Sequence, residues 1–338
     1  MPVSSCPRAA ASQHARLLQF ADPASLHRLY SRHLGARGRT LAIGGDSTTM
    51  YLATAIAGLS ASYKDTPLWR LKKQVLRKPL PWLVASRENS WDALIKYPEP
   101  HVFNWTRWGL AAGTQPDVFL LHAGIWCLHM HPWWTWREEW RLPSSQRLLL
   151  DDGCCGRARY RARLELAIGA ARRQAPHALI VVKTTNALCE EMWLNSRKKA
   201  AMAMGRATSL AMAYDARHIG GAGGGGRATR LDAATFESQA RDAQTRIGIK
   251  FDDYYGFLYR RSGAELQRQI VYDVAAAYSG VQVLDAFDVT SRLGCTFSSD
   301  GVHYVQRVRS IIGLDLLDII LHGLFNESLQ ANAESAAR

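Results

Sequence analysis

Short apolar segments recur along the chain, separated by turn residues and by longer stretches with a helical pattern. Because most residues in these segments are apolar, with little alternation of polar and apolar residues, they are typical of strands buried on both faces of a parallel sheet. A fifth strand is expected at Trp82–Ala85 or at His101–Trp105. The four clearest segments are Thr40–Ile43, Val118–His122, Ala178–Lys183 and Val281–Leu284.

Helical patterns fill the intervals between the expected strands. Thr48–Leu59 follows the first strand, Arg157–Arg173 carries arginines opposite a broad apolar face, and Tyr304–Leu324 repeats apolar residues at helical spacing. Strands that alternate with helices predict a mostly parallel sheet covered on both faces. The expected fold is therefore of the α/β class, a three-layer α/β/α sandwich.

One domain is expected, at residues 37–325 of the 338 in the chain. Residues 1–36 are interpreted as a flexible N-terminal segment and residues 326–338 as a C-terminal tail. The stretch from about 189 to 267 fits the alternation of strands and helices poorly, so it is interpreted as an insertion. It contains the run GGAGGGG, which no strand precedes, and this composition favours a flexible linker over a dinucleotide site.

Charge and cysteine content bear on the class of partner. The formal net charge of +13 suits an anionic partner, but no nucleic-acid motif accompanies it, so no specific nucleic acid is expected. The six cysteines form no C-x-x-C pair, so structural zinc is not expected and their disulfide pairing stays open. No cofactor is expected. The longest apolar stretch, 311–325, is interrupted by acidic residues, so no transmembrane segment is expected.

The first strand runs into the sequence LAIGGDSTTM, in which Ser47 stands at the turn between strand and helix. A residue here lies at the carboxyl end of the sheet, in the positive field of a helix start. Asp46 or Ser47 could simply cap the helix. The alternative is that Ser47 is a nucleophile, which requires a base.

A candidate base lies near the other end of the chain, in FSSDGVHYV. Asp300 and His303 are three residues apart, a spacing that places both on one side of a loop entering a helix. The carboxylate could hold one ring nitrogen of His303 and leave the other for Ser47. The alternatives are an N-cap role for Asp300 and a surface position for His303.

These motifs resemble the SGNH, or GDSL-type, hydrolase superfamily. GDST at 45–48 and DGVHY at 300–304 are most similar to its PC-esterase group, which includes trichome-birefringence-like and NXPE-like proteins. HVFNWTRWGL and PDVFLLHAGIW, at 101–110 and 116–126, resemble further blocks of that group. The resemblance implies a flavodoxin-like parallel sheet, and it covers about residues 40–128 and 280–310.

The resemblance also implies roles for individual residues. Ser47 would be the nucleophile, His303 the general base and Asp300 the acid that orients it. The oxyanion hole would comprise the Ser47 N–H, His122 and Gly124, although this group usually has asparagine where the chain has His122. Losing such a donor lowers the rate by about 10²–10³-fold. Two further residues, Arg107 and Trp126, are expected to contact substrate.

The implied function is a serine-dependent esterase or O-acyltransferase, with an acyl donor and a glycan or small ester as partners. The alternative is a weak or inactive relative that binds glycan through the tryptophan-rich stretch 126–140. A metal site formed by His122, Cys127, His129 and His131 is a third hypothesis, but the spacing matches no zinc pattern. The resemblance implies the secretory pathway or Golgi, whereas the absence of a signal peptide leaves plastid or cytoplasm open.

Overall fold

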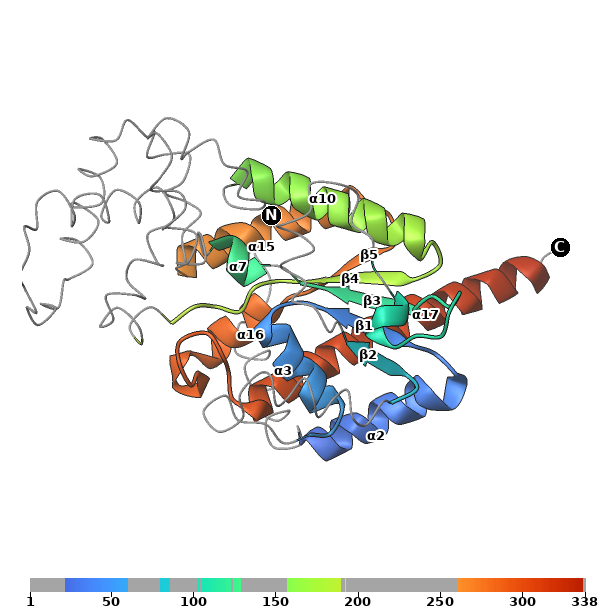
Figure 1. Cartoon of the computed structure of the whole chain (residues 1–338), viewed down its shortest axis with the longest axis horizontal. Helices are drawn as coiled ribbons and strands as arrows, with labels where there is room; N and C mark the ends of the chain where they lie inside the picture. Colours follow the sequence, from blue (N-terminus) through green and yellow to red (C-terminus); the bar gives the residue numbers. More distant parts are fainter. Residues whose placement is uncertain are drawn as a thin grey trace, which may run out of the picture.

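A five-stranded parallel sheet forms the centre of the protein in a computed structural model (Figure 1). The structure describes residues 22–59, 80–85, 103, 105–122, 124–128, 157–189, 192 and 261–336. The strand order is β2-β1-β3-β4-β5 and every neighbouring pair is parallel. The strands are β1 (Leu41–Gly44), β2 (Leu83–Ala85), β3 (Val118–Leu121), β4 (Leu179–Lys183) and β5 (Val281–Leu284).

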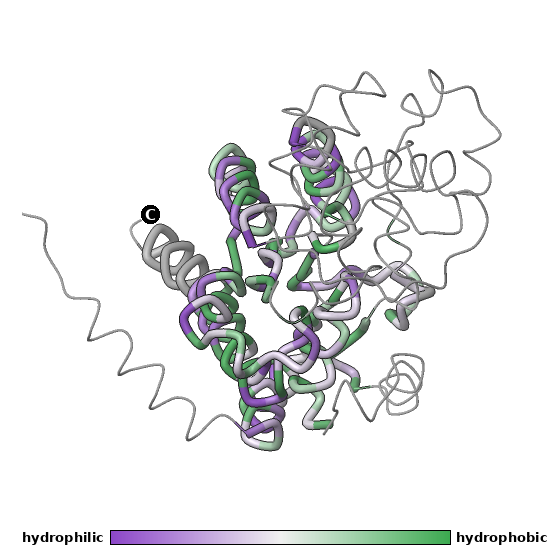
Figure 2. The backbone as a smooth tube through the Cα atoms, turned by 90° about the vertical axis from the view of Figure 1, so that its left-hand side faces the viewer, coloured by the Kyte–Doolittle hydropathy of each residue, from purple (hydrophilic) through white to green (hydrophobic). Residues whose placement is uncertain are grey.

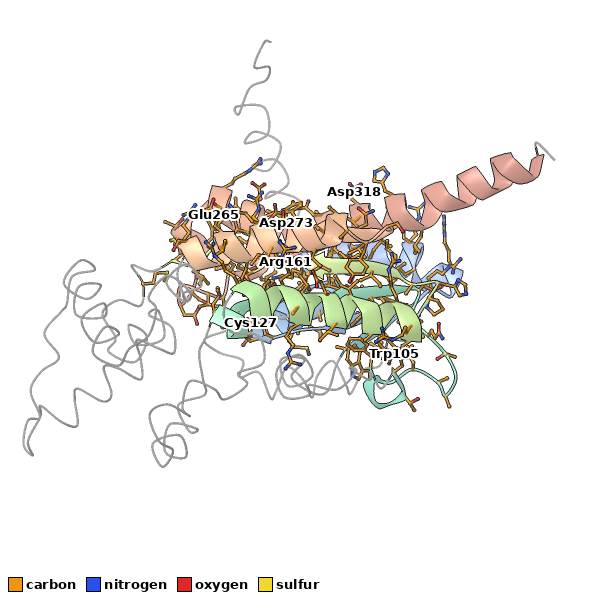
Figure 3. The ribbon with its side chains drawn as sticks, turned by 90° about the horizontal axis from the view of Figure 1, so that it is seen from above. Trp105, Cys127, Arg161, Glu265, Asp273 and Asp318 are labelled. Carbon is orange, nitrogen blue, oxygen red and sulfur yellow. A yellow bond between two sulfur atoms is a disulfide. The ribbon has the colours of Figure 1, made fainter. Side chains whose placement is uncertain are left out.

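Helices cover both faces of this sheet, which makes it the middle layer of an α/β/α sandwich (Figure 1). One face is covered by α10 (Arg157–Gln174) and α15 (Arg261–Ala276), which Arg161 and Asp273 join by a 2.7 Å ion pair (Figure 3). The other face is covered by α2 (Pro23–His33), α3 (Ser47–Ile56) and α17 (Gln306–Ala336). The predicted fold class is confirmed.

The remaining elements are short and lie at the strand ends and on the connections. They are η1 (Gly35–Arg37), α6 (Trp105–Trp108), α7 (Gly124–Leu128), α16 (Ala286–Leu293) and η3 (Cys295–Phe297).

Side chains that alternate along each strand supply the two cores. Leu41 and Ile43 of β1 join the core beneath α2, α3 and α17, whereas Ala42 joins the core beneath α10 and α15. Figure 2 shows the matching pattern in the helices, where hydrophobic residues turn toward the sheet and hydrophilic residues turn outward. Burial on both faces explains why β1 to β4 are almost entirely apolar, whereas the edge strand β5 carries the exposed Gln282.

The order of the strands determines where a site can form. The chain passes from β1 to β2 on one side and then returns to β3 on the other side of β1. Open α/β sheets bind ligands at the carboxyl edge beside such a reversal, and this order is the flavodoxin-like one. The turn that carries Ser47 follows β1 directly, at that edge.

The boundaries of the domain differ from those predicted. Residues 23–33, expected within a flexible segment, form α2, which begins at the N-cap Asp22 and buries Leu26 and Tyr30. The Tyr30 hydroxyl donates a 2.8 Å hydrogen bond to the carbonyl oxygen of Gly313 in α17. The prediction that 1–36 is flexible is therefore wrong for this helix, because two inward-facing residues in one helix suffice to dock it.

The two other predicted boundaries also change. Helix α17 continues to Ala336, so most of the expected tail 326–338 has a helical backbone. Helix α15 begins at Arg261, inside the expected insertion, whose residues 193–260 lie outside the described part. Within the described ranges, no helix combines the length and the apolar character that a bilayer crossing requires.

Candidate active site

The turn between β1 and α3 presents Ser47 at the carboxyl edge of the sheet. Asp46 is the N-cap of α3, because its carboxylate accepts hydrogen bonds from the Thr48 N–H at 2.9 Å and the Thr48 hydroxyl at 2.7 Å. A Cβ at Gly45 would lie 2.5 Å from the Thr49 side chain, so this turn accepts only glycine there. The capping interpretation is thus correct for Asp46, and it leaves the Ser47 hydroxyl available.

Ser47, His303 and Asp300 lie in a continuous hydrogen-bonded line. The Ser47 Oγ is 2.8 Å from the His303 Nε2, although 256 residues separate them in the sequence. The His303 Nδ1 is 2.9 Å from the Asp300 Oδ2. A proton on Nδ1, donated to the carboxylate, leaves Nε2 to accept the serine hydroxyl, so both contacts are satisfied by one tautomer.

Asp300 holds the loop as well as the imidazole ring. Its Oδ1 accepts the N–H groups of Val302 at 3.0 Å and His303 at 2.8 Å. Because α17 begins only at Gln306, Asp300 is not its N-cap, and that alternative is wrong. Burial disfavours the ionised form of Asp300. The hydrogen bonds and charge of His303, together with the two backbone N–H groups, outweigh burial and hold the pKa of Asp300 below its usual value.

Packing fixes the ring of His303 and confines it to one orientation. Only 9% of the residue is exposed, so the surface interpretation of this histidine is wrong. Tyr51 of α3 makes an edge contact with the imidazole at 5.5 Å between ring centroids. The guanidinium of Arg309 lies 5.0 Å from the centroid of the same tyrosine ring, which completes a stack behind His303.

His122 lies in a buried network next to the serine turn. Its Nδ1 is 3.2 Å from the Asp46 Oδ2 and 2.9 Å from the Thr49 Oγ1, while its Nε2 is 3.5 Å from the Thr185 Oγ1. Burial lowers the pKa of His122, against the attraction of Asp46. Burial alone would raise the pKa of Asp46, but His122, Lys183 and Thr48 hold it well below the usual range.

Gly124 lies where a larger residue cannot fit. A Cβ there would be 1.9 Å from the Thr185 Oγ1 and 2.9 Å from the His122 Nε2. Its carbonyl oxygen accepts a 2.6 Å hydrogen bond from the Gln267 Nε2, and the Gln267 Oε1 accepts one of 2.7 Å from the Thr185 hydroxyl. These contacts fix the Gly124 peptide beside His122. Oxyanion binding by either residue stays a prediction.

The segment after β4 is tied to the loop of Asp300 and His303. Cys189 forms a disulfide with Cys295, and its N–H donates a 2.9 Å hydrogen bond to the Gly301 carbonyl oxygen. The Tyr304 hydroxyl donates one of 2.9 Å to the carbonyl oxygen of Ala187. The disulfide answers part of the question that the cysteine count left open.

Sequence reasoning missed four polar residues around the serine turn. The run TTN directly after the apolar strand β4 could have indicated two of them, because polar residues at the carboxyl edge of a parallel strand are candidates for a site. Lys183 and Gln267 carried no such signal. A lysine at the end of a strand and a glutamine within an expected insertion usually lie in solvent. The four residues are Lys183, Thr185, Asn186 and Gln267.

The predicted substrate contacts are placed only through their helices. Arg107 belongs to α6 and Trp126 to α7. Figure 3 places Trp105 of α6 and Cys127 of α7 toward opposite ends of the layer, so the two helices do not lie together. The side chains of Arg107 and Trp126 lie outside the described part, as do residues 129–156 with the other tryptophans of that stretch. Both roles stay predictions.

The metal hypothesis loses part of its ligand set. Cys127 is disulfide-bonded, which removes it as a thiolate ligand. The nitrogens of His122 face Asp46, Thr49 and Thr185. His129 and His131 lie outside the described residues. Among the residues that are described, no group of three potential ligands is close enough to hold a metal ion.

Comparisons with known proteins identify no family. No family model and no curated protein matches the chain. One solved structure, described as "a putative platelet activating factor from Streptococcus pneumonia", aligns with 93% of this chain and 100% of its own, at 13% identity and a TM-score of 0.36. A likeness at this level is too weak to bear on fold or function.

Proposed function

We propose that the protein is a serine-dependent acyl esterase or O-acyltransferase of the SGNH type, acting on a glycan or another hydroxyl or ester substrate. The observation that supports this most is the pair of contacts at His303, 2.8 Å to the Ser47 Oγ and 2.9 Å to the Asp300 Oδ2. A base within hydrogen-bonding distance of a hydroxyl, and itself oriented by a carboxylate, is the arrangement that activates a serine nucleophile.

In the acylation step, the Ser47 Oγ attacks the carbonyl carbon of the acyl donor and its proton passes to the His303 Nε2. The Asp300 carboxylate, ionised because its pKa is low, stabilises the imidazolium. The imidazolium then protonates the leaving oxygen of the donor as the carbon–oxygen bond breaks. The acyl group remains on Ser47 as an ester.

In the second step, an acceptor hydroxyl attacks the ester on Ser47. The His303 Nε2 takes the acceptor's proton and returns it to the Ser47 Oγ as that oxygen leaves. Water as acceptor gives an esterase, and a sugar hydroxyl gives an O-acyltransferase. The same triad serves both reactions, so the access of water to the site would decide between them.

The negative oxygen formed in both steps needs hydrogen-bond donors. Ser47 is the first residue of α3, so its backbone N–H has no partner within the helix and lies in the positive field of the helix start. We assign this N–H to the oxyanion hole. The rigid Gly124 peptide, which lies beside His122, would form the opposite wall of that hole. His122 supports that wall by contacts with Asp46 and Thr49.

The test is ester hydrolysis and fluorophosphonate labelling of the wild type and of Ser47→Ala. We expect the variant to lose the label and to lose at least about 10⁴-fold in kcat on an acetyl ester. Ser31→Ala is the matched control, because the Ser31 Oγ lies 3.4 Å from the His27 Nε2. Among the described residues the Nδ1 of His27 has no hydrogen-bond partner, so this pair lacks an orienting acid.

Two results would count against the proposal. Full esterase activity in Ser47→Ala would refute the assigned nucleophile. Binding of acetylated polysaccharide by the wild type, without turnover and without labelling, would favour the alternative of an inactive glycan-binding relative.

A further inference from the structure

A lysine lies buried beneath the serine turn. Lys183 is the last residue of β4 and is 2% exposed. Its ammonium nitrogen lies 3.0 Å from the Thr184 carbonyl oxygen, 3.2 Å from the Asn186 Oδ1 and 3.5 Å from the Thr48 Oγ1. The three N–H donors of the ammonium thus meet three oxygen acceptors. Burial of a charge is costly unless it is paired in this way.

One branch of these contacts reaches the nucleophile. Thr48 follows Ser47 in the chain, and its hydroxyl donates to the Asp46 Oδ1 at 2.7 Å. Lys183 therefore supports, through Thr48, the N-cap that shapes the serine turn. Its positive charge also attracts the Asp46 carboxylate and favours the ionised form of that group.

The other branch reaches the base. Asn186, whose amide oxygen accepts from Lys183, donates from its Nδ2 to the Val302 carbonyl oxygen at 3.2 Å. That carbonyl belongs to the peptide bond leading directly into His303. Lys183, Asn186 and His303 also line one small cavity of about 10 Å³ with Thr48, Tyr51 and Arg309, which is room for about one water molecule.

We propose that Lys183 is a positioning residue that holds the Ser47 turn and the His303 loop in register for acyl transfer. The inference rests on the proposed function. It extends the site to a residue that touches neither the substrate nor the reacting atoms and that acts through Thr48 and Asn186. A displacement of about 1 Å between nucleophile and base can cost about 10²-fold in rate, so a shared buried support has a kinetic effect.

This arrangement predicts a dependence on pH. Burial lowers the pKa of Lys183 to about 8, against the attraction of Asp46. Above that pH the neutral amine keeps two N–H donors for three acceptors, and Asp46 loses a nearby cation. The rate should therefore fall as the pH rises through about 8. The other ionisable groups around the serine turn are Asp46 at the N-cap of α3, His122 after β3, Tyr160 on α10, His303 in the loop before α17, and Arg309 in the first turn of α17.

The experiment compares Lys183→Met with the wild type, with acetyl-ester kinetics measured from pH 6 to 10. We expect kcat to fall by up to about 100-fold with KM unchanged, and the alkaline limb of the wild type to disappear. The rate of fluorophosphonate labelling should fall with kcat. Arg163→Met is the matched control, because Arg163 is 8% exposed on α10 and its loss should leave kcat and the pH profile unchanged.

A folded Lys183→Met with unchanged kcat and an unchanged alkaline limb would overturn the inference. If Lys183→Met does not fold, the inference is tested by the wild-type pH profile and by the kcat of Asn186→Leu. A fall above pH 8 together with a lowered kcat in Asn186→Leu supports the role, and the absence of both overturns it. The proposed function fails separately, because only its failure leaves the wild type unlabelled at Ser47 or leaves Ser47→Ala active.

Discussion

Replacement of Asp300 by asparagine would separate the two duties of this side chain. In the wild type, one carboxylate oxygen accepts two backbone N–H groups, at 3.0 and 2.8 Å, and the other accepts the His303 Nδ1–H at 2.9 Å. Asparagine can keep the first oxygen in place and so preserve the turn. It then presents an N–H₂ group to the His303 Nδ1, where two donors would meet.

The imidazole can relieve this conflict only by moving its proton to Nε2. That nitrogen would then donate to the Ser47 Oγ, 2.8 Å away, and could no longer accept the hydroxyl proton. A wrong tautomer with intact geometry lowers kcat by about 10⁴-fold, which corresponds to about 5.4 kcal/mol in the activation free energy. Because both backbone hydrogen bonds survive, the free energy of unfolding should change by less than about 1 kcal/mol.

The assay is acetyl-ester turnover together with urea unfolding of Asp300→Asn and Asp300→Ala. The alanine variant also leaves two backbone N–H groups without their acceptor, so it should be less stable by about 1–3 kcal/mol. Asp288→Asn serves as a control, because that carboxylate pairs with Arg292 on the outer side of α16, at 2.9 Å. An Asp300→Asn variant that retained more than a tenth of the wild-type kcat would refute the tautomer argument.

Two further substitutions test the surroundings of the triad. Gly124→Ala would place a Cβ 1.9 Å from the Thr185 Oγ1, so we expect the free energy of unfolding to fall by about 1–3 kcal/mol. Adding Thr185→Ala should restore part of this loss. Urea unfolding measures both variants, and unchanged stability in Gly124→Ala would contradict the close contact. Cys189→Ser removes a crosslink to Cys295 that spans 106 residues, so the free energy of unfolding should fall by about 2–5 kcal/mol. The melting temperature would show it, and equal values for variant and wild type would count against it.

The sheet could be predicted because most of its strands are buried on both faces and are therefore rich in apolar residues. The four clearest strands are confirmed, and the fifth is Leu83–Ala85 rather than His101–Trp105. The contact between Ser47 and His303 could also be predicted, because motif order placed one after the first strand and the other before the last helix. The fold then brings both to the same edge of the sheet.

The missed residues are those whose burial depends on distant parts of the chain. Lys183 ends a strand, and a lysine in that place usually extends into solvent; here its ammonium lies 3.5 Å from the Thr48 Oγ1, which is 135 residues away in the sequence. Gln267 had no local signal because its partners, Gly124 and Thr185, lie 143 and 82 residues away in the sequence. Pattern alone reports local structure and says little about such pairings.

The docking of α2 has a practical consequence for anyone who shortens this chain. Leu26, Tyr30 and Leu34 are at most 2% exposed, and Leu26 touches the position of Gly313 on the long C-terminal helix. That helix also packs against α3, the helix that starts at Ser47. The amino-acid pattern alone would place the domain boundary at residue 37. Removal of the residues before it would take away α2 and expose the apolar core surface that this helix covers, which would promote aggregation. Expression should therefore start upstream of Asp22.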